Sequence, residues 1–118
     1  MRHLRDHRKL NLKSAHRKAY LRNQVIHLIN YGHIDISLAA AKEVRRFAEK
    51  MVTLAAKGSN FNTIRRAKQL LPYSAPAITA LFEKVAPQYV SRPGGYTRIL
   101  RLGRRASDSA VMARLQWV

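Results

Sequence analysis

The last quarter of the chain alternates between apolar and polar residues in two runs, and this pattern constrains the fold most strongly. Residues 96–102 are YTRILRL and residues 111–118 are VMARLQWV. The segment between them, GRRASDSA, is polar and glycine-containing, as turns commonly are. Two alternating runs that flank such a loop predict an antiparallel hairpin. The alternation assigns Tyr96, Arg98, Leu100 and Leu102 to one face, and Thr97, Ile99 and Arg101 to the other.

Upstream of the hairpin, apolar residues recur at the three- and four-residue spacing of amphipathic helices. The first helix is predicted to begin at an N-cap, Ser14, and to end at Gly32. The second is predicted to be capped by Ser37 and to end at Lys57–Gly58. Its buried stripe is predicted to contain Ala41, Val44, Ala48, Met51 and Ala55, with Glu43, Arg46, Glu49 and Lys50 on the other side.

Two further helices are expected in the middle of the chain. One is capped by Ser59 or Asn60 and is stopped by Pro72. The other covers residues 74–85, with Pro76 in its first turn and Pro87 at its end. The short alternating segment HIDIS, residues 33–37, predicts a strand that completes a three-stranded sheet.

These elements predict an α+β fold in two layers. About four helices are expected to pack on a small mixed sheet that includes the C-terminal antiparallel hairpin. Residues 1–13 are expected to form a basic arm outside the core, because they hold five lysines and arginines and too few large apolar residues to bury. Residues 14–118 are expected to form a single globular domain.

The charge of the chain limits the kind of partner it can have. It has 23 lysines and arginines against six aspartates and glutamates, a net charge of +17. Such self-repulsion is relieved by a polyanion, and nucleic acid is the commonest one. No apolar run reaches the ~18 residues of a membrane-spanning helix, so no membrane partner is expected. Charge alone does not separate an RNA binder from a DNA-compacting protein.

The basic residues concentrate at the two ends of the chain. Residues 1–30 hold eight lysines and arginines against one acid, and residues 92–118 hold six arginines against one acid. Arginine makes bidentate contacts with phosphate, and adjacent glycines allow backbone amides to approach a phosphate closely. The predicted RNA-binding residues are Arg2, His3, Arg5, Arg8, Lys9, Lys13, His16, Arg17, Arg22, Arg45, Arg46, Arg92, Gly94, Gly95, Tyr96, Thr97, Arg98, Arg101, Arg104 and Arg105.

Neither an enzyme nor a metal protein is expected. The six carboxylates form no recognisable acid–base pair, and the chain contains no nucleophile elbow or P-loop. A basic nuclease with a site built from distant residues is an unfavoured alternative. His3, His7 and His16 lack the carboxylate or cysteine partners of a typical metal site. We therefore predict no catalytic residue, no metal, no cofactor and no small-molecule substrate.

Three stretches of the chain carry distinctive motifs. The N-terminal stretch has Met1-Arg2-His3, Lys9-Leu10-Asn11, Ser14, His16-Arg17 and Arg22-Asn23. The second has AKEVRR, residues 41–46, followed by TLA, residues 53–55. The third and most specific is Ala86-Pro87 followed by RPGGYTRIL, residues 92–100. Together these stretches resemble the bacterial-type large-subunit ribosomal protein family number seventeen.

The resemblance implies a structural, non-catalytic constituent of the large ribosomal subunit. It implies that the chain binds large-subunit ribosomal RNA, contacts neighbouring large-subunit proteins, and supports rRNA folding and subunit assembly for translation. The expected location is the cytoplasmic ribosome, with an organellar ribosome as the alternative. The expected contact regions are the N-terminal arm and the Gly-Gly-Tyr-Thr-Arg turn.

Overall fold

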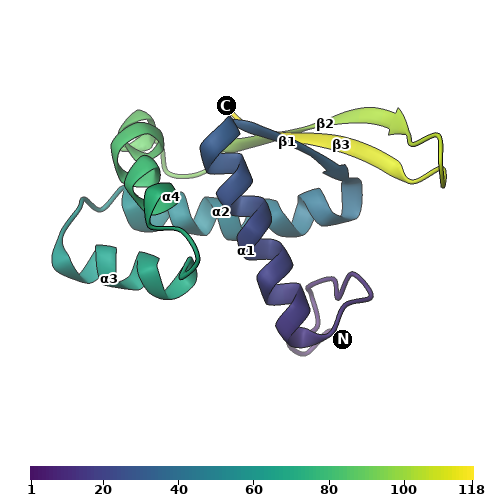
Figure 1. Cartoon of the computed structure of the whole chain (residues 1–118), viewed down its shortest axis with the longest axis horizontal. Coiled ribbons are helices and arrows are strands. Elements are labelled where there is room, and N and C mark those ends of the chain that lie inside the picture. The colour runs from purple at the N-terminus through teal and green to yellow at the C-terminus, as the bar shows by residue number, and fades with distance from the viewer.

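The computed structural model describes residues 1–118 and shows an α+β fold, as predicted. Figure 1 shows a three-stranded sheet over a long central helix, with the other helices grouped around that helix. One face of the sheet packs on the helices, while no helix covers the opposite face. No helix combines the length and apolar character needed to cross a membrane.

Helix α1, Ser14–Tyr31, begins one residue earlier than predicted. Lys13 occupies the N-cap position and Ser14 is already helical, so the prediction of a Ser14 cap was wrong. The C-terminal prediction is confirmed: Gly32 has a φ of 82°, and its amide donates to the Leu28 carbonyl at 2.9 Å. A left-handed residue at this position favours glycine, which has no Cβ.

Strand β1, His33–Ser37, leads directly into α2, Leu38–Ala55. The predicted cap is confirmed, because the Ser37 hydroxyl accepts from the Ala40 amide at 3.4 Å. All five residues of the predicted apolar stripe are buried. Glu43 was predicted to lie on the solvent side, but it is only 6% exposed because the N-terminal arm lies over it.

Helix α3 covers Phe61–Leu70 and is capped by Asn60, whose side chain accepts from the Thr63 amide at 3.0 Å. The predicted fourth helix is not continuous. It divides into α4, Ala75–Ala80, a π-helical turn, Leu81–Val85, and a 3-10 turn, Ala86–Tyr89. Pro87 does not end the helical segment, contrary to prediction. Its missing N–H interrupts the α-helical hydrogen bonding, and the chain continues with a different turn width.

Strands β2, Thr97–Arg104, and β3, Val111–Trp117, form the predicted hairpin. The sheet order is β1-β3-β2, and both pairings are antiparallel. The prediction of a mixed sheet was therefore wrong. The β2–β3 register starts at Thr97↔Trp117 and shifts between Arg101 and Gly103. The far end of the hairpin projects beyond the helices (Figure 1).

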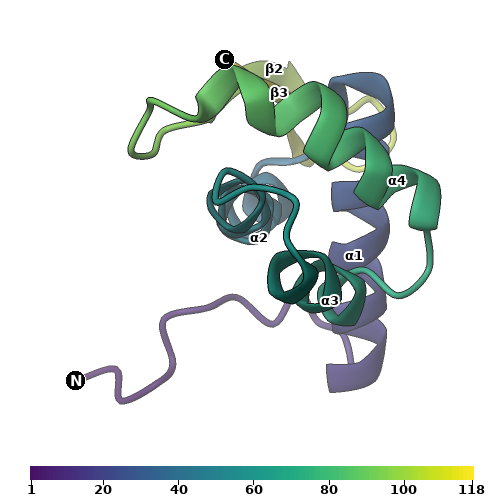
Figure 2. The ribbon, with the colours of Figure 1, turned by 90° about the vertical axis from the view of Figure 1, so that its left-hand side faces the viewer.

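The core lies between the sheet and α2. Its largest fully buried side chains include Leu28 from α1, Met51 from α2 and Leu115 from β3. Seen from the side, α2 runs through the middle, with α1, α3 and α4 around it (Figure 2). The N-terminal arm and the hairpin are attached to this core from opposite ends of the sequence.

Candidate nucleic-acid interface

The carboxylates of the molecule neutralise few of its cations. Six ion pairs involve five arginines: Arg8, Arg45, Arg46, Arg105 and Arg114. Of the 23 lysines and arginines, 18 therefore have no carboxylate within ion-pair distance. Most of the positive charge is thus free to interact with an external anion.

The N-terminal arm, residues 1–13, has no helix or strand but has a defined course. The Leu12 amide donates to the Lys9 carbonyl at 3.1 Å and closes a turn. Leu10 and Asn11 in this turn have φ values of 54° and 55°, an uncommon conformation for residues other than glycine. Four predicted contact residues of the arm are exposed and lack an ion pair: Arg2, Arg5, Lys9 and Lys13.

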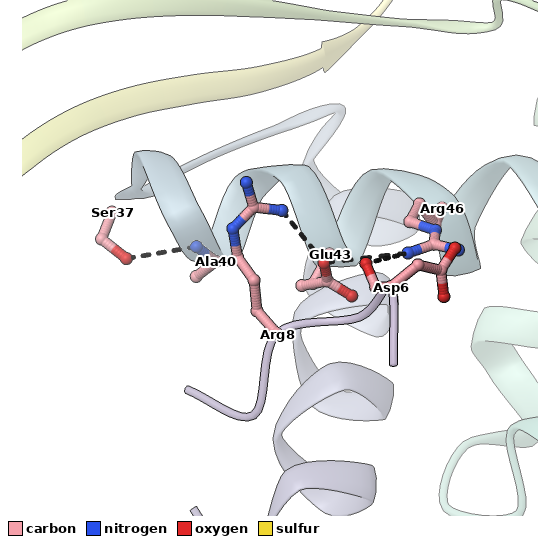
Figure 3. Close-up of polar contacts among 6 residues, drawn as sticks. All are labelled: Asp6, Arg8, Ser37, Ala40, Glu43 and Arg46. Atoms are coloured by element: carbon pink, nitrogen blue, oxygen red, sulfur yellow. Dashed lines mark hydrogen bonds and ion pairs between the residues drawn. The ribbon is translucent and has the colours of Figure 1, made fainter. Parts of the chain in front are cut away.

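The other two charged side chains of the arm, Asp6 and Arg8, point to α2 (Figure 3). Arg8 donates to Glu43 at 3.2 Å, and Asp6 accepts from Arg46 at 2.9 Å. The Arg46 guanidinium also donates to the Asp6 backbone carbonyl at 3.3 Å. The hydrogen bond from Arg46 lowers the pKa of Asp6 below its usual value. Arg8 and Arg46 were both predicted to contact RNA, but here they form ion pairs with carboxylates of the protein itself.

Helix α1 extends the positive surface next to the arm. None of its 18 residues is acidic, and Lys18, His16 and Arg17 lie in its first half. Arg17 donates to the Leu12 carbonyl at 3.3 Å, which connects the helix to the end of the arm. Arg22 donates to the Tyr73 hydroxyl at 3.3 Å, with its guanidinium carbon 5.6 Å from the centre of that ring.

Between α1, α2 and α3 lies an open cavity of about 320 Å³. Leu21, Phe47 and Leu70 form its apolar part, and Lys18 and Arg22 are the charged lining residues. Sequence reasoning did not include Lys18 among the predicted contacts. The absence of acid throughout α1 was the available signal, because Lys18 then has no partner within its own helix.

Strand β2 carries the second group of free cations. Arg98, Arg101 and Arg104 are exposed and have no ion pair. Arg105 differs, because it binds Asp108 through contacts of 2.9 and 2.7 Å. This pairing, with a hydrogen bond from the Ala110 amide, lowers the pKa of Asp108 to about 2. The tip of the hairpin is therefore internally neutralised, while the strand before it is not.

The glycine turn before β2 is open on its surface. Gly94 and Gly95 have φ values of 148° and 64°, and a Cβ at either position would meet no atom within 4 Å. These glycines are thus required by backbone conformation and leave the backbone uncovered. Arg92 lies nearby with its guanidinium carbon 5.6 Å from the centre of the Tyr89 ring.

Two predicted contact residues in this segment are buried. Tyr96 is 3% exposed, and its ring centre lies 5.2 Å from that of Tyr89. Thr97 is 4% exposed, and its hydroxyl donates to Glu49 at 2.8 Å. The alternation had grouped Tyr96 with Arg98, but Tyr96 precedes the first paired residue of the strand and turns into the core. Neither side chain is available to an external ligand.

Three predicted contact residues remain: Arg45, His3 and His16. Arg45 forms an ion pair with Glu49 at 3.5 Å, and both side chains are partly exposed. His3 and His16 are exposed. No group of three or more histidine, aspartate or glutamate side chains is arranged to hold a metal ion. The structure therefore shows exposed cations on the arm, α1 and β2, and no group of side chains arranged to hold a metal ion.

Comparisons with known proteins identify the family of the chain. The model of the family described as "Ribosomal protein L17" matches residues 20–118. A protein of Alkaliphilus metalliredigens is 45% identical over 115 residues, covering 96% of this chain and 98% of the relative. One of Clostridioides difficile is 42% identical over 114 residues, covering 95% and 97%. Both relatives are named "Large ribosomal subunit protein bL17". Matches of this extent show that the chain belongs to the ribosomal protein L17 family.

Proposed function

We propose that the protein is a structural constituent of the large ribosomal subunit and binds large-subunit ribosomal RNA. The names of both relatives place those proteins in that subunit, and each relative aligns with nearly all of this chain. Membership of a family of structural ribosomal proteins makes it a non-enzyme. The single observation that carries the RNA-binding proposal is the set of 18 cations without a carboxylate partner.

The proposed contacts come from three regions. Arg2, Arg5 and Lys9 of the arm bind phosphates, and the cations of α1 continue that surface. At the other end of the chain, Arg98 and Arg101 bind phosphates while the Gly94–Gly95 backbone approaches the RNA. Such contacts position a protein through the RNA backbone and its shape, with little dependence on base sequence.

Burial changes the roles proposed for Tyr96 and Thr97, and ion pairing changes those proposed for Arg8 and Arg46. Tyr96 and Thr97 support the binding surface from below, because they join the start of β2 to the core. Arg8 and Arg46 hold the arm on α2 through carboxylates. The direct phosphate contacts are therefore assigned to the neighbouring arginines and lysines that have no carboxylate partner.

The projecting hairpin supports a second kind of contact. Leu100, Leu102 and Val111 are exposed although they are apolar. Leucine and valine side chains gain more from contact with other apolar groups than from contact with phosphate. We assign these residues to contacts with neighbouring large-subunit proteins. Both relatives come from bacteria, which supports a ribosome in the bacterial cytoplasm and a role in rRNA folding and assembly.

Sedimentation of the tagged chain from a cell lysate tests the proposed function. We expect it to sediment with the large ribosomal subunit on a sucrose gradient and to remain there after a high-salt wash. A sample treated with ribonuclease is the control and should lose this sedimentation. Release at moderate salt, or sedimentation with DNA, would contradict the proposal.

Binding to purified RNA tests the electrostatic part separately. Each phosphate contact should add roughly −0.7 to −0.9 to the slope of log affinity against log salt concentration. The slope for large-subunit rRNA should therefore be steep. A slope near zero would show that the free cations do not bind phosphates.

A further inference from the structure

The N-terminal arm contains one feature that opposes its own proposed role. Asp6 is the sole acid in residues 1–34, and a carboxylate repels phosphate. It does not face solvent alone, because Arg46 of α2 binds both its carboxylate, at 2.9 Å, and its backbone carbonyl, at 3.3 Å (Figure 3). The acid thus connects the arm to the helix.

A second connection lies two residues further along the arm. Glu43 is one of the few buried polar side chains, and a buried carboxylate needs a partner. That partner is Arg8 of the arm at 3.2 Å, and Arg46 lies 4.0 Å from the same oxygen. The cluster therefore contains two arginines and two carboxylates and is locally neutral. Its ion pairs join the arm to α2 and add no net charge to the surface.

The rest of the arm continues this attachment. Leu10 and Leu12 are half-buried, and together with His16, Tyr20, Ser37 and Ala40 they line an open cavity. Arg17 of α1 holds the Leu12 carbonyl. Residues 6–12 are thus fixed at both ends against the helices, while the side chains of Arg2, Arg5 and Lys9 remain without carboxylate partners.

We infer that Asp6, through Arg46, is a positioning residue that fixes the arm on α2 before RNA binds. This inference rests on the proposed RNA-binding function. Fixing the arm in advance reduces the conformational entropy that is lost on binding. Removing the negative charge of Asp6 should consequently weaken RNA binding, although it makes the protein more positive.

The test compares two variants with the same change of charge. Asp6→Asn removes the ion pair with Arg46, whereas Glu83→Gln removes an exposed acid that has no ion pair. Glu83 lies in the π-helical turn Leu81–Val85 after α4. The ribbon of this segment lies across the molecule from the arm in Figures 1 and 2. Asp6 is about half exposed and Glu83 is exposed, so neither Asp6→Asn nor Glu83→Gln should prevent folding.

The first readout is affinity for protein-free large-subunit rRNA. Asp6→Asn should bind roughly two- to fivefold more weakly than wild type, the range given by loss of one exposed ion pair. Glu83→Gln should bind as well as wild type or slightly better. In an Arg46→Gln background, Asp6→Asn should cause no further weakening, because the pair is already absent. Equal effects of the two acid substitutions would overturn the inference.

The second readout is backbone order in the free protein by ¹⁵N NMR relaxation. Residues 6–12 should be nearly as ordered as α1 in wild type and Glu83→Gln, and should fall below an order parameter of about 0.6 in Asp6→Asn. An arm that is equally mobile in all three proteins would overturn the inference even if each binds RNA. A wild-type protein with an ordered arm and no affinity for rRNA would instead contradict the proposed function.

Discussion

The N-terminal arm and the C-terminal hairpin carry the same kind of charge but are held in place differently. The hairpin is part of a hydrogen-bonded sheet, and Leu115 on its inner face is fully buried. The arm has no such ladder and is attached by Asp6, Arg8 and a turn with left-handed residues. Strand β2 therefore presents Arg98, Arg101 and Arg104 with no acid bound to them, whereas ion pairs with acids help to hold the irregular arm in position.

Both regions are attached to the same helix through one glutamate each. Glu43 binds Arg8 of the arm, and Glu49 accepts from the amide and hydroxyl of Thr97 at the start of β2. The difference lies in the partner. Arg8 is about half exposed, so its ion pair is open to screening by salt, whereas Thr97 is buried and its hydrogen bonds are screened much less. We expect salt to loosen the arm before it affects the hairpin.

The largest expected effect comes from breaking the core under the hairpin. Leu115→Ala should lower the free energy of unfolding by about 2–5 kcal/mol, because it leaves a cavity in a fully buried site. Deletion of residues 1–9 should lower it by no more than roughly 2 kcal/mol, since it removes two weak ion pairs. Urea denaturation followed by circular dichroism measures both. A larger loss from the deletion would show that the arm is part of the core.

The next effect separates free arginines from paired ones on the hairpin. Arg98→Gln should weaken rRNA binding by about 1.5–3 kcal/mol, the range for a hydrogen bond to a charged group. Arg105→Gln is the matched control and should weaken it less, because Asp108 already neutralises Arg105. Filter binding at fixed salt measures both affinities. Equal losses would mean that the ion pair at the tip opens when RNA binds.

A smaller effect tests the attachment of β2 to α2. Thr97→Val keeps the shape of the side chain but removes the hydroxyl that donates to Glu49 at 2.8 Å. The free energy of unfolding should fall by about 1 kcal/mol, as for a single net hydrogen bond. RNA affinity of the folded variant should change little, since Thr97 is buried. A large loss of affinity with unchanged stability would instead indicate that Thr97 contacts RNA.

The smallest effect is confined to the hairpin tip and appears only in acid. Arg105 lowers the pKa of Asp108 from 3.8 to about 2. Because the folded pKa is the lower one, the contribution of the pair is present above pH 3.8 and is lost as the pH falls through about 2. NMR titration of the Asp108 carboxyl should show the low midpoint in wild type. In Arg105→Gln the midpoint should move up toward 3.8.

Sequence patterns predicted the elements better than the contacts between them. The apolar stripe of α2, the strand at residues 33–37 and the hairpin are local periodicities, and all three are confirmed. The π-helical turn after α4 and the burial of Tyr96 were missed, because each depends on how the chain packs on the core. The cluster around Glu43 was also missed, since Arg8 lies 35 residues away in sequence.

The candidate surface was predictable only in outline. The excess of cations at the two chain ends follows from composition along the sequence, and the free arginines of β2 agree with it. Which cations have carboxylate partners follows only in part. The pair of Arg105 with Asp108 is local in sequence, whereas Arg46 and Asp6 come from distant segments. A list of basic residues therefore overstated the number that are free to bind phosphate.

Because α2 holds both basic regions, it also fixes the distance between the two points where they are attached. Glu43 and Glu49 are six residues apart on α2, which corresponds to about 9 Å along an α-helix. This rigid spacer keeps the attachment points of the arm and of β2 at a constant separation. Under the proposed function, α2 thereby holds the arm and the start of β2 at a set separation, so an RNA that contacts both regions must present phosphates at a matching distance.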